Sequence, residues 1–212
     1  NNKTYDGTTT ATMSALGALS GFIGSETVTA AVNTATFADK NVGTGKTITL
    51  AYTLSDGTNG GLASNYSLAN NTTTGNITAK ALTIGTATAN NKTYDGTTTA
   101  SISGGTLSGV VNNDVLTLTQ SGNFSQANVG NGLAVTVLDS ISGAAAGNYT
   151  LTQPTGLTAN ITAKTLTVSG TTVSNKVYDG SNSAVVAGGS LVGVIAGETI
   201  GLVQAGTFSQ TT

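Results

Sequence analysis

An eleven-residue sequence occurs twice in this chain without a single change, and the repetition limits the folds open to it. The segment NNKTYDGTTTA stands at residues 1–11 and again at 90–100, and a diverged copy, SNKVYDGSNSA, stands at 174–184. Self-similarity at a nearly fixed period is the signature of repeat architectures. The segment therefore predicts a structural unit that is used three times, because a catalytic site is seldom present in tandem copies.

Other short sequences return in the same order after each copy, and they set the repeat boundaries. Tyr5 and Tyr94 lie 89 residues apart, and Tyr94 and Tyr178 lie 84 apart. The first landmarks are an acidic residue (Glu26, Asp114 and Glu198) and a phenylalanine (Phe37, Phe124 and Phe208). They are followed by an NVG turn (41–43 and 128–130), an NY pair (65–66 and 148–149) and an NITAK segment (76–80 and 160–164). They predict repeat 1 over 1–80, repeat 2 over 81–164 and repeat 3 over 165–212. We expect repeat 1 to lack its leading ALTI-type strand, repeat 2 to be complete and repeat 3 to be truncated.

The length of the repeat favours a small β-sandwich over a solenoid. A solenoid coil takes about 20–30 residues, whereas an immunoglobulin-like sandwich takes about 100. In the segment TITLAYTL at 47–54, large apolar residues alternate with threonine or alanine, as they do in a half-buried strand. Helical periodicity is absent. We predict an all-β fold of tandem immunoglobulin-like antiparallel β-sandwich repeats that form an elongated rod.

The complete repeat shows where its strands should lie. In repeat 2 we expect strands at Leu82–Thr88, Thr97–Ile102, Val115–Gln120, Asn123–Gln126, Leu133–Leu138, Tyr149–Thr152 and Leu157–Thr162. Successive repeats follow each other directly, with ITAK ending one and ALTI beginning the next, and no Pro/Gly/Ser-rich spacer lies between them. Such a joint should be short and fairly stiff.

Composition excludes several classes of function. Only 8% of the residues are charged, against about 25% in ordinary domains, arginine is absent, and the net charge is −2. This argues against nucleic-acid partners and polybasic membrane attachment. No apolar run is long enough for membrane insertion. The absence of cysteine and histidine removes disulfides, thiolate and imidazole metal ligands, and the commonest general base, so we expect no enzyme activity and no cofactor.

The KxYDG motif itself favours a structural role. Asp-Gly is a strong turn signal, the lysine is placed to pair with an acid, and the preceding tyrosine can bury its ring and bind its hydroxyl, as in a tyrosine corner. The predicted structural motif comprises Lys3, Tyr5, Asp6, Gly7, Lys92, Tyr94, Asp95, Gly96, Lys176, Tyr178, Asp179 and Gly180.

The motif, together with the F…NVG, NY and ITAK.LT landmarks, resembles the YDG-type repeat of very large bacterial surface exoproteins. Those proteins are similar to filamentous haemagglutinin and other adhesins exported by two-partner secretion. The resemblance spans essentially the whole chain. It implies a β-rich extracellular repeat that serves as a stalk or spacer, with adhesion often located elsewhere, and it implies no catalytic residues.

Three chemical alternatives remain open from the residues. A weak calcium site is one, at the DGTNGG turn of 56–61, although no D-x-D-x-D-G run exists. An intramolecular Lys–Asn isopeptide bond is another. The candidate lysines are Lys3, Lys92, Lys176, Lys80 and Lys164, and the candidate asparagines are Asn41, Asn128, Asn65 and Asn148. The candidate acids are Glu26, Asp114 and Glu198. The third is glycosylation at N-x-S/T sites, which include Asn2, Asn65, Asn71, Asn76, Asn91, Asn123, Asn148 and Asn160. The GTGKTIT segment at 43–49 lacks the first glycine of a phosphate-binding loop.

We therefore expect structural stalk repeats of a secreted adhesin at the bacterial cell surface, which serve adhesion or the building of matrix and biofilm. The partners would be neighbouring repeats and a host-surface or matrix ligand. The alternatives are repeats that themselves bind a glycan, ice or a host protein, and a fibre segment that self-associates by strand addition, in which Thr165–Ser169 of one molecule completes repeat 1 of another.

Overall fold

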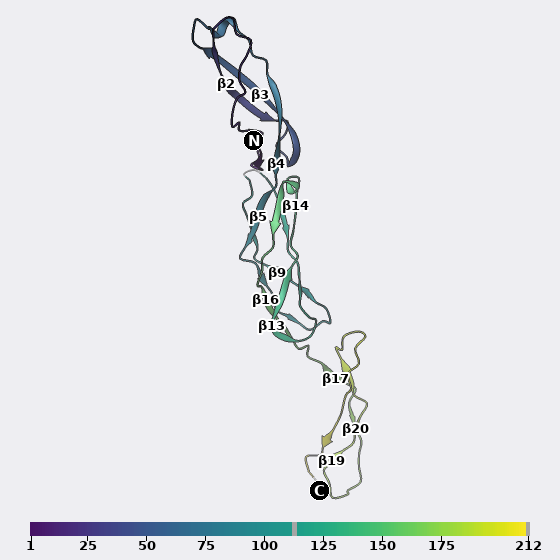
Figure 1. Cartoon of the computed structure of the whole chain (residues 1–212). Coiled ribbons are helices and arrows are strands. Elements are labelled where there is room, and N and C mark those ends of the chain that lie inside the picture. The colour runs from purple at the N-terminus through teal and green to yellow at the C-terminus, as the bar shows by residue number, and fades with distance from the viewer. Residues whose placement is uncertain (112–113, 211–212) are drawn as a thin grey trace. The chain divides into compact units, whose positions relative to one another are not determined.

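The computed structural model describes residues 1–111 and 114–210 and confirms the all-β prediction (Figure 1). In this part of the chain the helical elements are two 3₁₀ turns, η1 at Ala63–Asn65 and η2 at Ala146–Asn148. Each follows a loop and precedes the tyrosine of an NY pair. No helix within the described ranges could span a membrane. Thr211 and Thr212, at the end of repeat 3, lie outside them.

The chain forms two compact units whose boundaries fall inside repeat 2 rather than between repeats. Unit 1 consists of Asn1–Ala87, Gly104–Gln120 and Leu138–Pro154. Unit 2 consists of Thr88–Ser103, Ser121–Val137 and Thr155–Thr212. Repeat 1 therefore shares a unit with the first strand and several later segments of repeat 2. The remainder of repeat 2 shares a unit with repeat 3.

The first sheet of unit 1 contains repeat 1. Its strand order is β1-β4-β3-β2, with bounds β1 Lys3–Thr4, β2 Val28–Phe37, β3 Gly43–Asp56 and β4 Asn71–Thr78. The long strands β2 and β3 run side by side as an antiparallel hairpin with a bulge between Val32 and Thr34 (Figure 1). The alternation predicted from 47–54 is seen in β3, where Ile48 and Leu50 are buried and the threonines between and beside them are exposed.

The second sheet of unit 1 comes from repeat 2. It has the order β10-β5-β15, with bounds β5 Lys80–Gly85, β10 Thr106–Ser108 and β15 Tyr149–Thr152, and a further pair joins β11 Thr117–Thr119 to β14 Ser140–Ser142. Leu82 of β5 is fully buried and belongs to the same apolar cluster as Tyr5, Phe37 and Ile48. One core is thus built from two repeats, and burial of apolar surface is the main force that joins them.

Unit 2 holds a five-stranded sheet and four short ladders. The sheet has the order β7-β16-β13-β12-β8, with bounds β7 Lys92–Thr93, β8 Thr99–Ala100, β12 Gly122–Phe124, β13 Gly130–Val137 and β16 Thr158–Thr162. The ladders pair β6 Thr88–Ala89 with β9 Ile102–Ser103, β17 Thr167–Ser169 with β21 Ser190–Val192, β18 Thr172–Val173 with β20 Val186–Ala187, and β19 Ser183–Ala184 with β22 Gly206–Thr207.

The structure corrects the predicted strand pattern in two respects. The sheets are mixed rather than purely antiparallel, because β1 pairs with β4, β5 with β15, and β7 with β16 in parallel. Three strands of repeat 2 were also not predicted, namely β7, β10 and β14. They are two or three residues long, too short to show a period, and tertiary pairing rather than local sequence makes them strands.

Candidate functional site: a tyrosine–carboxylate joint between repeats

Each KxYDG motif folds into the same compact turn. In repeat 1, the Lys3 Nζ donates to Asp6 Oδ1 at 2.7 Å and to the carbonyl oxygens of Thr8 and Thr10 at 2.7 and 2.9 Å. The same Asp6 oxygen accepts the backbone N–H of Thr8 at 2.9 Å, and Gly7 has φ +78°. The ammonium also lies 5.6 Å from the ring centre of Phe37. The lysine therefore ties the turn to the strand that follows it.

The turn is reproduced in repeats 2 and 3. The lysine–aspartate distance is 2.7 Å for Lys92 and Asp95 and 2.8 Å for Lys176 and Asp179. The glycine φ values are +78° at Gly96 and +76° at Gly180. The predicted lysines, aspartates and glycines thus lie together within each motif. The tyrosines do not share this local role.

Tyr5 reaches out of its own repeat. Its ring is 1% exposed, and its hydroxyl donates to Asp114 Oδ2 of repeat 2 at 2.9 Å. Tyr149, the tyrosine of the NY pair in repeat 2, donates to the same oxygen at 2.5 Å. Its hydroxyl also accepts the backbone N–H of Val111 at 3.0 Å. The two rings meet edge to face with centroids 5.4 Å apart, a favourable aromatic geometry.

The glycine of the motif makes room for this contact. A Cβ built on Gly7 would lie 2.7 Å from Val111 Cγ1, closer than two carbon atoms can approach. Glycine is therefore favoured at position 7 for two reasons. The backbone there is left-handed, and a larger residue would collide with Val111 of the next repeat. At Gly96 the equivalent Cβ would lie 3.2 Å from Ile195 Cγ2, in repeat 3.

A second polar contact joins the NVG turn of repeat 1 to the NY pair of repeat 2. The buried Asn148 accepts the backbone N–H of Val42 on its Oδ1 at 2.9 Å. Its Nδ2 donates to Asn41 Oδ1 at 3.2 Å. Both ends of the buried amide are thus satisfied, as a buried polar group requires. We call this set of Tyr5, Asn41, Asp114, Asn148 and Tyr149 the repeat joint.

The electrostatics of the joint favour a charged Asp114 and neutral phenols. The hydrogen bond from Tyr149 lowers the pKa of Asp114 below its usual value, and the bond from Tyr5 adds to this effect. Burial, followed by the bond to Asp114, raises the pKa of Tyr5 to about 12. The same two causes raise the pKa of Tyr149. Around neutral pH the joint therefore consists of one carboxylate that accepts two phenol hydrogens.

The same relationship recurs along the chain. In unit 2, the hydroxyl of Tyr94 donates to the carboxylate of Glu198 in repeat 3, and this bond is the main reason that the pKa of Tyr94 is raised. A hollow of about 180 Å³ lies beside Tyr94 and Leu166. Within repeat 1, Tyr66 donates to Glu26 at 2.6 Å and accepts the N–H of Ile23 at 3.2 Å. All three acidic landmarks thus accept a tyrosine hydroxyl.

The burial of the YDG tyrosine differs among the three repeats. Tyr5 is buried against repeat 2, and Tyr94 is half-buried against the described part of repeat 3. Tyr178 is 75% exposed and makes no side-chain hydrogen bond to the described residues. The tyrosine is therefore a contact residue between repeats, and the rest of the motif is a turn that positions it.

Sequence reasoning missed the acceptor of the tyrosine. The prediction placed the phenol in a corner of its own repeat, whereas Asp114 lies in the following one. The signal was present in the recurrence of Glu26, Asp114 and Glu198 at corresponding places. A recurring acid beside an apolar strand calls for a recurring donor, and the tyrosines of the YDG motif and of the NY pair are the candidates.

The isopeptide candidates at the repeat joint are engaged in other contacts. Lys3 is engaged by Asp6, Thr8 and Thr10, and the amides of Asn41 and Asn148 bind each other. Asp114 is occupied by two phenols. The chemistry would need a neutral lysine beside an amide and a protonated acid, whereas Lys3 forms an ion pair.

The predicted calcium site folds as a turn. Asp56 Oδ1 accepts the N–H of Ala63 at 2.7 Å, and Gly57 and Gly61 are joined through their backbones. Among the described residues, no group of three or more His, Cys, Asp or Glu side chains is placed to hold a metal ion. The GTGKTIT segment forms the start of β3, and Lys46 pairs with Asp39 at 2.6 Å.

Fold and joint together define a tandem all-β repeat protein whose repeats interlock through recurring side chains. The chain belongs to the YDG domain family, whose model matches residues 1–74, 78–156 and 162–212. Neither a curated protein nor a solved structure matches the chain.

Proposed function

We propose that this chain is a structural stalk of a secreted bacterial adhesin, which holds a binding region away from the cell surface or builds extracellular matrix. The observation that supports it is the repeat joint, in which Tyr5 of repeat 1 and Tyr149 of repeat 2 share the carboxylate of Asp114. The most strongly repeated residues of the chain thus serve the connection between repeats. A stalk is the class of protein for which such a connection is the essential feature.

The joint favours a stiff connection. A flexible spacer has few contacts across it and behaves as a coil, whereas repeats 1 and 2 share an apolar core and satisfied polar groups. In our proposal the repeats are immunoglobulin-like sandwiches that stack into a rod outside the cell. The absence of cysteine suits a role free of redox chemistry, and the low charge suits one that does not depend on electrostatic steering.

Cells that produce the protein offer the most direct test. Antibodies raised against the chain should label intact cells. Beads coated with the chain should not adhere to host cells or to a glycan array, because a stalk carries no adhesion of its own. Strong binding by the beads would favour the ligand-binding alternative, and a lack of surface labelling would contradict the location.

Mechanical unfolding tests the stalk role itself. The force needed to unfold unit 1 should fall when Tyr5 is replaced by phenylalanine, because the joint then loses one bond to Asp114. The matched control is Tyr52→Phe, whose hydroxyl has no hydrogen bond to the described residues. An unchanged force for Tyr5→Phe would remove the joint as the basis of the proposal.

A second candidate is binding to an extended flat ligand such as ice, and a threonine rank favours it. Thr36, Thr49 and Thr72 lie side by side on β2, β3 and β4, and all three are exposed. Thr47 and Thr74 form a second rank beside them. A thermal-hysteresis assay with Thr49→Tyr as the disrupted variant decides this, since a bulky ring at the centre of the rank would abolish the effect.

A further inference from the structure

The repeat joint brings two phenol hydroxyls onto one carboxylate oxygen. Tyr5 and Tyr149 donate to Asp114 Oδ2 at 2.9 and 2.5 Å, so the oxygen-bearing ends of both rings converge on a single atom. The ring centroids are 5.4 Å apart, and the ring planes meet at 78°. All three side chains belong to unit 1, although the tyrosines come from different repeats. The fold therefore holds two phenols against one shared base.

This pair differs from the other tyrosines of the chain. Among the described residues there are two contacts between aromatic rings, that of Tyr5 with Tyr149 and that of Phe22 with Tyr66. Tyr66 also donates to an acid, Glu26, but its ring partner is a phenylalanine, which has no hydroxyl. The tyrosines without a ring contact in the described part of the chain are Tyr52, Tyr94 and Tyr178. A reaction that needs two phenols therefore points to the repeat joint.

Oxidative coupling is such a reaction, and it joins an ortho carbon of each ring by a new C–C bond. Each phenol loses one electron and one proton and becomes a phenoxyl radical, whose unpaired electron is shared between the oxygen and the ortho carbons. The two radicals couple at these carbons. Each ring regains its aromatic form when the hydrogen on the newly bonded carbon is transferred to the oxygen. The net change is the loss of two hydrogen atoms, which hydrogen peroxide accepts as its O–O bond breaks to give two molecules of water.

Asp114 supplies the base that this reaction needs. A phenol becomes a strong acid when it loses an electron, and a carboxylate within hydrogen-bond reach can take its proton in the same step. The bond from Tyr149, followed by that from Tyr5, lowers the pKa of Asp114, so the carboxyl is ionised at neutral pH. The Asp114 residue is half-buried rather than buried, and it can pass the first proton to water before the second phenol is oxidised. One carboxylate can therefore serve both oxidation steps.

We infer that Tyr5 and Tyr149 are the site of an oxidative tyrosine–tyrosine cross-link, with a peroxide as the co-reactant and Asp114 as the base. The two rings are only 1% and 7% exposed, which keeps their radicals away from the tyrosines of other molecules. Electron transfer itself needs no direct contact between ring and oxidant. The new bond ties repeat 1 to repeat 2 in a chain that has no cysteine for a disulfide. It goes beyond the proposed stalk role and does not depend on it.

Photo-oxidation with tris(bipyridine)ruthenium and persulfate tests the cross-link, because persulfate is a peroxide that accepts two electrons. The dilute chain should lose two hydrogen atoms from its intact mass and gain the blue fluorescence of coupled tyrosine. Cleavage after lysine should release 4–40 and 93–164 as one joined fragment, since these segments carry Tyr5 and Tyr149. Tyr5→Phe and Tyr149→Phe should each abolish the joined fragment and its fluorescence.

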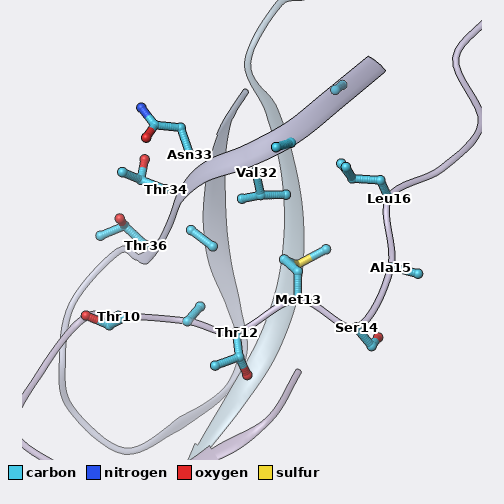
Figure 2. A pocket seen from close by; sticks show the side chains of 14 residues that line it. Thr10, Thr12, Met13, Ser14, Ala15, Leu16, Val32, Asn33, Thr34 and Thr36 are labelled. Carbon is cyan, nitrogen blue, oxygen red and sulfur yellow. The ribbon is translucent and has the colours of Figure 1, made fainter. Parts of the chain in front are cut away.

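Two side chains are removed from the background in which all variants are made. Tyr178 is 75% exposed and open to coupling between molecules, so it is replaced by phenylalanine. Met13 is the one methionine of the chain and faces Val32 across the hollow between 10–16 and 30–36 (Figure 2). Its thioether takes up an oxygen atom on oxidation, which would obscure the loss of two hydrogens. Met13→Leu removes this reaction with little change in volume.

Matched controls separate the pair from tyrosine oxidation in general. Tyr66→Phe removes a phenol that is bound to an acid but packed against Phe22, and Tyr94→Phe removes the other tyrosine of the 93–164 fragment. Both variants should form the joined fragment as the background chain does. Asp114→Asn keeps both rings and should slow coupling about a hundredfold, the lower end of what a positioned base contributes.

Three results would overturn the inference. One is a background chain that keeps its full mass after oxidation. Another is a joined fragment that persists in Tyr149→Phe or disappears in Tyr94→Phe, since the bond would then lie elsewhere. The third is an equal yield of the joined fragment when the chain is oxidised in denaturant, because the fold would then have no part in bringing the two phenols together.

Discussion

Tyr5 and Asp114 are separated by 109 residues and joined by a hydrogen bond of 2.9 Å. The tyrosine belongs to the YDG motif of one repeat and the aspartate to the acidic landmark of the next. Their contact shows that the motif is conserved between repeats of this chain for a connection, and not only for a turn.

Replacing Tyr5 by phenylalanine should destabilise unit 1 by about 1–2 kcal/mol. The ring still fills its place in the core, but Asp114 loses one of its two phenol donors, and a hydrogen bond to a charged group contributes about 1.5–3 kcal/mol. Denaturant unfolding followed by amide exchange in unit 1 measures the loss. The hydroxyl of Tyr52 has no bond to the described residues, so Tyr52→Phe should change stability by less than about 0.5 kcal/mol. Equal effects of the two substitutions would contradict a stabilising role for the hydrogen bond between Tyr5 and Asp114.

Replacing Asp114 by asparagine should lower the pKa of Tyr5 from about 12 while leaving it above its ordinary value of 10.0, because burial is the larger cause of the shift. The raised pKa also has a consequence for stability. A phenol whose pKa is raised on folding contributes fully below pH 10 and loses its contribution as the pH rises towards 12. Ultraviolet titration of the wild type against Tyr5→Phe isolates this one phenol. A pKa of Tyr5 unaffected by Asp114→Asn would be inconsistent with the hydrogen bond.

Replacing Gly7 by alanine should cost more than the same change at Gly60. Both glycines lie in unit 1 with positive φ, +78° and +86°, so both variants incur about 1–2 kcal/mol of backbone strain. Only at Gly7 would the new methyl group meet a neighbour, Val111, at 2.7 Å. Overpacking should add about 1–3 kcal/mol there. The second substitution Val111→Ala should recover much of this excess, and a double-mutant cycle on unfolding free energies measures it.

The aspartates of the second and third YDG turns should titrate far below ordinary aspartates. Hydrogen bonds from Lys92 and Thr97 lower the pKa of Asp95 to about 2, and those from Lys176 and Ser181 do the same for Asp179. Because the folded-state pKa is depressed, each turn keeps its full contribution to stability above about pH 3.8 and loses it as the pH falls towards 2. Carboxyl carbon NMR should show both values. Lys92→Met should return Asp95 towards 3.8, the ordinary value, without affecting Asp179.

The repeats, the all-β class and the local turn could be read from the linear sequence. The period comes directly from identical segments, and alternation such as that at Ile48 and Leu50 reports a strand whose two faces differ in exposure. The Asp-Gly turn is equally local, because Lys3, Asp6 and Gly7 are neighbours in the chain and need no distant partner to define its shape.

The pairing of repeats was decided only by tertiary structure. Nothing in the sequence around Tyr5 distinguishes a hydroxyl bound within its own repeat from one bound to Asp114, since both arrangements bury the same ring. The short strands β7, β10 and β14 are likewise strands only because a partner lies beside them. Hydrogen bonds and packing contacts between residues far apart in the chain depend on how the strands assemble in space. A local sequence pattern indicates that a polar or apolar side chain needs a partner, but it does not indicate which residue that partner is.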